Sequence, residues 1–93
     1  MVRRVSIEDR GRCGAVTYQD GAHRLVGYWE FSSGEAIAYV RCGGAEEWVR
    51  HPWALGRRAE ILRYIADEVV RQKAPGCRAE IDQTSGDILV YPS

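Results

Sequence analysis

The chain has 93 residues, of which 45% are hydrophobic and 28% are charged, and its 13 Lys and Arg balance 13 Asp and Glu. These values are typical of one globular domain spanning residues 1–93, and they exclude disorder and low-complexity sequence. Charge neutrality removes the basic excess that a dedicated nucleic-acid or membrane-surface binder carries, so we expect neither partner.

The cysteines and the first residues of the chain define the expected compartment. The chain has three cysteines, Cys13, Cys42 and Cys77, and no two of them have the C-x-x-C spacing. Because an odd number cannot all pair, we expect free thiols in a reducing environment. His23 and His51 add no recognised ligand spacing, and we expect no metal and no cofactor. No apolar signal region and no run of membrane-spanning length is present, which predicts a cytoplasmic protein.

The first half of the chain predicts strands joined by hairpins. Apolar residues alternate with polar ones, and Asp20-Gly21 and Ser32-Ser33-Gly34 are turn sequences. We expect four strands, at residues 4–8, 15–18, 23–31 and 35–42.

The second half predicts one long helix and a last hairpin. Pro52 suits the first turn of a helix, but Gly56 weakens a helix that begins so early, so the expected long helix runs from Arg57 to Lys73. Its apolar face consists of Leu62, Ile65, Ala66 and Val69. Strands at 78–82 and 87–91 complete the order ββββ-α-ββ. We therefore expect an α+β fold, with the long helix packed on one face of an antiparallel sheet of five to six strands.

The second face of this sheet is a candidate interface. One helix covers one face, yet three expected strands carry apolar residues on both faces. The candidate interface residues are Val26, Tyr28, Ile37, Tyr39, Leu89 and Tyr91. We expect a second copy of the chain, or another protein, to cover them, because an exposed apolar patch of roughly several hundred Å² marks an interaction site. The alternative is a strongly twisted, partly closed sheet that residues 43–56 shield.

A second candidate site lies just before the long helix. Its residues are Trp48, Arg50, His51, Trp53, Arg57 and Arg58, a set with three Arg and no acid. Arg donors, aromatic walls and a helix N-terminus favour a small anionic ligand. In the alternative interpretation, the two Trp residues plug the end of the core, Arg57 points to solvent, and Arg58 pairs with Glu46 or Glu47.

Catalysis and RNA binding are weaker alternatives. His51 could act as a general base and Cys42 as a nucleophile, but no catalytic motif surrounds either one, so we assign no catalytic residue. Exposed tyrosines could stack single-stranded RNA, although the basic surround is missing. The candidate stacking residues are Tyr18, Tyr28, Tyr39 and Tyr91. The composition and patterning best fit a non-catalytic module that binds a protein partner or itself.

Overall fold

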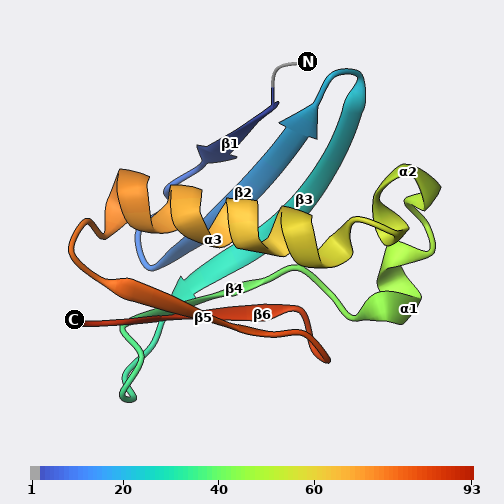
Figure 1. Ribbon diagram of the computed structural model, residues 1–93. Coiled ribbons are helices and arrows are strands. Elements are labelled where there is room, and N and C mark those ends of the chain that lie inside the picture. Colours follow the sequence, from blue (N-terminus) through green and yellow to red (C-terminus); the bar gives the residue numbers. More distant parts are fainter. Residues whose placement is uncertain (1–2) are drawn as a thin grey trace.

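The computed structural model describes residues 3–93 and contains one curled antiparallel sheet with a long helix across it (Figure 1). The strands are β1 (Arg3–Ile7), β2 (Cys13–Asp20), β3 (His23–Phe31), β4 (Ala38–Arg41), β5 (Arg78–Asp82) and β6 (Asp87–Tyr91). They lie in the order β1-β2-β3-β4-β6-β5, and every neighbouring pair is antiparallel. The structure confirms the expected α+β class and the antiparallel sheet.

Three helices separate β4 from β5: the long helix that the sequence predicted, and two short ones before it. They are α1 (Ala45–Trp48), α2 (Pro52–Leu55) and α3 (Arg58–Lys73). Pro52 begins α2 and Gly56 follows its last residue, so the segment before α3 forms two short turns of helix. No helix within residues 3–93 is long and apolar enough to cross a membrane.

The element boundaries follow the sequence pattern closely; β1 lies one residue earlier than expected, and the largest differences are in β4 and β2. β3, β5 and β6 have the expected bounds, and α3 begins one residue later than expected. β4 begins at Ala38 rather than at residue 35, because the Ser32 N–H donates to the Ile37 carbonyl and holds 32–37 in a turn. β2 begins at Cys13 rather than at residue 15, because Gly14 already pairs with Trp29 of β3.

The core fills the space between α3 and the inner face of the sheet. Alternate residues of β2 and β6 are buried there, and the predicted apolar face of α3 is buried with them. The largest fully buried side chains are Trp48, Tyr18, Ile61, Leu62, Ile65 and Ile88. Trp48 belongs to α1, so the short helices complete the same core.

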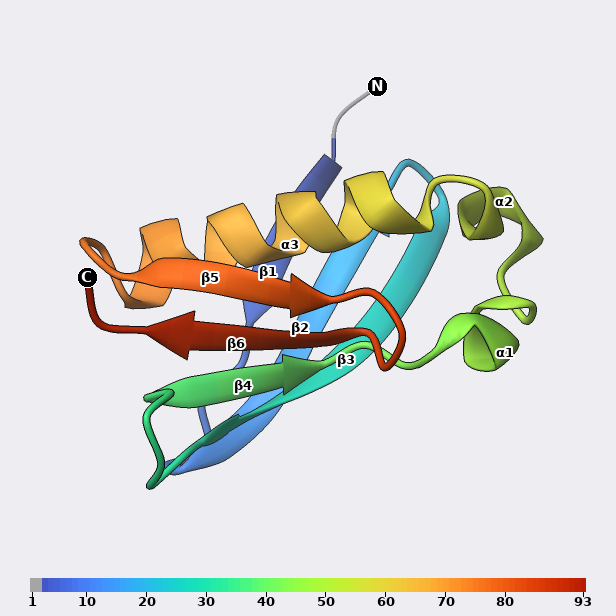
Figure 2. The same ribbon diagram turned by 60° about the horizontal axis from the view of Figure 1, so that its bottom comes forward.

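α3 also reaches both edges of the curled sheet (Figure 2). Its Tyr64 hydroxyl donates to the Arg3 carbonyl at 3.0 Å, and its Gln72 amide donates to the Val5 carbonyl at 2.9 Å. Two carbonyls of the edge strand β1 are thereby hydrogen-bonded to α3. β5, at the other edge, packs against the same helix. The helix therefore protects the β1 edge from pairing with another strand.

Candidate functional site

The predicted 48–58 cluster divides into two separate groups. Trp48 has only 1% of its surface exposed, and its indole N–H donates to the Cys42 carbonyl at 2.9 Å. Arg58 lies over the Trp48 ring, with 5.7 Å from its guanidinium carbon to the ring centre. Arg58 also donates to the Gly43 carbonyl at 3.2 Å instead of pairing with Glu46 or Glu47. This first group closes the end of the core.

Trp53 forms the second group with aromatic residues of the β2–β3 hairpin. Its ring stacks on His23, with 4.7 Å between ring centres and 12° between planes. Tyr18 lies parallel to Trp53 at 6.3 Å, and His51 meets the same ring edge-on at 6.1 Å. Both histidines of the chain therefore touch one tryptophan, a contact that the linear spacing of His23 and His51 does not suggest.

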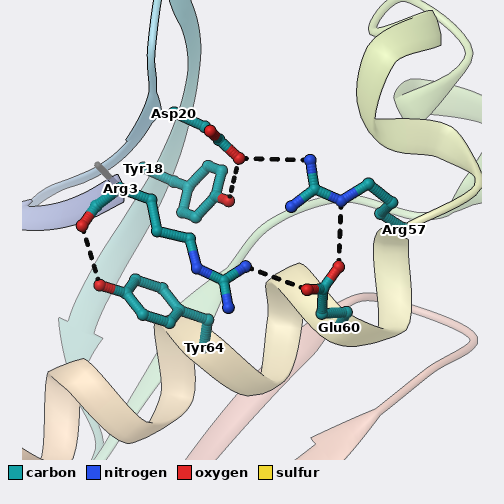
Figure 3. Close-up of polar contacts among 6 residues, drawn as sticks. All are labelled: Arg3, Tyr18, Asp20, Arg57, Glu60 and Tyr64. Carbon is teal, nitrogen blue, oxygen red and sulfur yellow. Dashed lines mark hydrogen bonds and ion pairs between the residues drawn. The ribbon is translucent and has the colours of Figure 1, made fainter. Parts of the chain in front are cut away.

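An ion-pair network connects the start of β1 and the end of β2 to the N-terminal end of α3 (Figure 3). Arg57 pairs with Asp20 at 3.2 Å and with Glu60 at 3.0 Å, and Arg3 pairs with Glu60 at 3.2 Å. The Arg57 side chain is 37% exposed, as the helical wheel suggests, but the end of β2 also brings Asp20 within reach of its guanidinium. Two cations and two anions make the network neutral, so Arg57 is not free to bind an anionic ligand.

Asp20 is the buried member of the network. Only 2% of its surface is exposed, and its Oδ2 accepts the Tyr18 hydroxyl at 2.9 Å. This hydrogen bond, assisted by the Arg57 charge, lowers the pKa of Asp20. Its Oδ1 has no hydrogen-bond partner among residues 3–93. The turn sequence Asp20-Gly21 was the available signal, since a tight hairpin places Asp20 directly opposite His23.

Arg50 is the remaining basic member of the predicted cluster. It is exposed in the connection between α1 and α2, and it makes no side-chain hydrogen bond or ion pair within the described part of the chain. His51 is the half-buried residue before α2. Of the three arginines expected to bind an anion, two are therefore engaged by groups of the chain itself.

The outer face of the sheet brings together most of the predicted interface. Val26 is 61% exposed and Tyr28 is 45% exposed, while Tyr39, Leu89 and Tyr91 are half-buried. The segment 43–56 leaves Val26 and Tyr28 exposed, although its Gly43 and Glu47 line a hollow beside Val26. Ile37 is outside β4 and lines a pocket together with core residues of the inner face.

The tyrosines proposed to stack RNA are differently placed. Tyr18 is fully buried on the inner face, so it cannot be a stacking platform. The guanidinium carbon of Arg41 lies 4.9 Å from the centre of the Tyr39 ring. The guanidinium carbon of Arg78 lies 4.6 Å from the centre of the Tyr91 ring. Tyr28 is thus the one member of the set that is exposed and has no cation placed over its ring in the described structure.

An apolar pocket opens beside the C-terminal half of α3. It has a volume of about 230 Å³. The sheet contributes Val16, Trp29, Val40 and Val90 to its wall, and α3 and the residue after it contribute Val69 and Ala74. Phe31 and Ile37 line the same pocket and are partly exposed, while Asp9 and Lys73 are its two charged members. Sequence reasoning did not find this pocket, because its wall consists of residues that read simply as core.

The aromatic group, the outer face and the pocket are built from common residue types without a catalytic arrangement that identifies a reaction. Comparison of the chain with protein-family models, curated proteins and solved structures finds no match, so a functional proposal depends on the geometry of these residues.

Proposed function

We propose that this protein is a non-catalytic binding module that forms a twofold homodimer through the outer face of its sheet. The observation that carries the proposal is the exposure of Val26 and Tyr28 in the middle of a face that no element within residues 3–93 covers. Apolar residues in the middle of a sheet are normally buried against a second layer. A second copy of the chain supplies that layer without a further gene product.

The charges of the outer face support a second copy as the occupant. By strand alternation, the outward cations are Arg4, Arg24, Arg41 and Arg78, and the outward acids are Glu30, Glu80, Asp82 and Asp87. The β1–β3 half has one excess cation, and the β4–β6–β5 half has one excess acid. A twofold axis parallel to the strands places each half over the opposite half of its partner, so that unlike charges meet.

The edges of the sheet offer less support for self-association. α3 already binds two carbonyls of β1, which leaves less of that edge available for another strand. β5 carries Arg78, Glu80 and Asp82 toward the outer face, and charged side chains disfavour edge pairing. Face-to-face association therefore fits this chain better than extension of the sheet.

Sedimentation equilibrium over about 1 µM to 1 mM protein tests the proposal. We expect the wild type to dimerise with a dissociation constant of about 100 µM or tighter. Val26→Glu brings an uncompensated carboxylate into the interface and should weaken the dimer at least about tenfold, with the helix content unchanged in circular dichroism. Val49→Glu is the matched control, because Val49 is equally exposed at 57% but lies outside the sheet. A monomeric wild type at the highest concentration, or equal weakening by both variants, overturns the proposal.

A further inference from the structure

The pocket beside α3 has the size and lining of a site for a small apolar molecule. Its volume of about 230 Å³ exceeds that of a roughly 150 Å³ engineered cavity that binds benzene. Its wall consists of aliphatic and aromatic side chains on two rigid elements, the sheet and α3. Trp29 is held in place on this wall, since its indole N–H donates to the Glu8 carbonyl at 2.8 Å. The wall is therefore preformed.

The opening of the pocket is apolar as well. Phe31 is 48% exposed and Ile37 is 38% exposed, although both line the pocket. Phe31 meets Trp29 edge-to-face at 5.1 Å between ring centres, which fixes its ring at the opening. An apolar molecule inside the pocket would cover surface on both residues that water now contacts, and this burial favours binding.

Two charged residues of the pocket lining, Asp9 and Lys73, determine which kind of head group a bound ligand can carry. The side chain of Lys73, in the last turn of α3, makes no hydrogen bond or ion pair with any of residues 3–93. A lysine stem packs along apolar surface while its ammonium stays in water, so Lys73 can meet a head group at the opening. Asp9 is held differently, because its Oδ1 accepts the Gly11 N–H at 3.0 Å within the turn after β1.

We propose that the pocket binds an apolar monocarboxylate, such as a medium-chain fatty acid or an aryl-substituted short-chain acid. The hydrocarbon part lies among Val16, Trp29 and Val69, and the carboxylate pairs with Lys73 at the opening. This site is on the α3 side of the sheet, whereas Val26 and Tyr28 lie on the opposite face. It therefore does not depend on the proposed dimer.

Titration of ¹⁵N-labelled protein with three eight-carbon probes, octanoate, octanol and octylamine, tests the proposal. We expect octanoate to bind with a dissociation constant of about 0.1–1 mM and to shift the amide signals of Val16, Val40 and Val69. Octanol should bind about threefold to tenfold more weakly, and octylamine more weakly still. No saturable shift with octanoate, or equal binding of octanoate and octylamine, overturns the proposal.

Three variants assign the binding to this pocket. Ala38→Leu places extra side-chain volume into the pocket and should reduce octanoate affinity at least about tenfold. Lys73→Gln changes an exposed residue, keeps the fold, and should lower octanoate affinity to that of octanol without changing octanol binding. Asp9→Asn preserves the acceptor for Gly11 and should raise octanoate affinity about twofold to fivefold by removing a like charge.

Controls separate this proposal from the dimer. Arg50→Gln, which removes an exposed cation outside the pocket, should leave octanoate affinity unchanged, and so should Val26→Glu. A loss of octanoate binding in Asp9→Asn would contradict the assignment of a simple carboxylate, because it would mean that Asp9 itself holds the ligand. Unchanged octanoate binding in both Ala38→Leu and Lys73→Gln would contradict the pocket as the site.

Discussion

The guanidinium of Arg57 binds the buried carboxylate of Asp20, with 3.2 Å between Nη1 and Oδ2, and so joins the residue before α3 to the last residue of β2. The Tyr18 hydrogen bond and the Arg57 charge lower the pKa of Asp20 in the folded protein. The ionised carboxylate therefore stabilises the fold above the unfolded-state pKa of about 3.9, and this contribution disappears as pH falls through the folded-state pKa.

We predict that Asp20→Asn is less stable than the wild type near neutral pH and that the two stabilities converge in acid. Urea unfolding at a series of pH values between about 7 and 2 measures both curves. Neighbouring arginines also lower the pKa values of Glu60 and Glu68. The stability of Asp20→Asn should therefore still fall in acid, but less steeply than that of the wild type. Asp67→Asn, which removes only an exposed ion pair with Arg63 on α3, is the control and should change stability by no more than about 0.5 kcal/mol at neutral pH. A constant gap between wild type and Asp20→Asn at all pH values would contradict the prediction.

Trp48→Phe should reduce the free energy of unfolding by about 1–3 kcal/mol, because phenylalanine leaves the part-buried Cys42 carbonyl without its indole donor. Denaturant unfolding at neutral pH measures the loss. Trp53→Phe is the matched control, since the Trp53 indole N–H has no hydrogen-bond partner in the structure of residues 3–93. Equal losses in the two variants would show that the Trp48 hydrogen bond contributes nothing.

Gly14→Ala and Gly56→Ala should change stability in opposite directions. A Cβ at Gly14 would collide with the Glu8 carbonyl and come within 2.6 Å of the Trp29 indole nitrogen, two groups that are already hydrogen-bonded to each other. We expect a loss of about 2 kcal/mol or more. Gly56 has helical backbone angles and open space around it, so alanine there should raise stability by about 0.4–1 kcal/mol. Thermal unfolding of both variants checks the order, and the reverse order would count against this packing of the turn after β1.

The Cys42 thiol should react slowly in the native protein. Burial, together with the Asp87 charge, raises its pKa to about 12, so only roughly one thiol in ten thousand is ionised at pH 8. We expect alkylation of Cys42 by iodoacetamide at pH 8 to be at least about 100-fold slower in the native protein than in the urea-unfolded chain. Peptide mass spectrometry distinguishes Cys42 from the other two cysteines. Similar native and unfolded rates at this residue would show that the strand end is open to solvent.

Elements that depend on local periodicity could be predicted from the sequence. The β-branched and aromatic residues of 23–31, which lie between two turn sequences, predicted β3, and the helical spacing after Arg57 predicted α3. Both elements have nearly the expected bounds. Ile37 was assigned to the interface because alternation was extended through 35–42, whereas the turn before β4 interrupts it. Local pattern fails where the backbone leaves the strand.

The candidate site was harder to predict because it depends on contacts between distant segments. A helical wheel of α3 contains no information on the end of β2, which supplies the partner of Arg57. The pocket depends on where the end of α3 crosses the curled sheet, and no residue type marks it. Trp53 could be identified as a candidate, but its contact with His23 required the hairpin to be placed against α2.

The sheet consists of two parts, each built from strands that are consecutive in the chain: the β1–β4 meander and the β5–β6 hairpin. Hydrogen bonds between β4 and β6 join the two parts. This ladder closes across residues 42–86, which contain all three helices, whereas every other ladder joins strands that follow each other in the chain. The hydrogen bonds between β4 and β6 should therefore break first under mechanical force or in mild denaturant. We expect amide hydrogen exchange in β4 and β6 to be faster than in β2 and β3. α3 is hydrogen-bonded to β1 of the meander and packs on β5 of the hairpin. The helix would therefore hold the two parts together after the β4–β6 hydrogen bonds have broken.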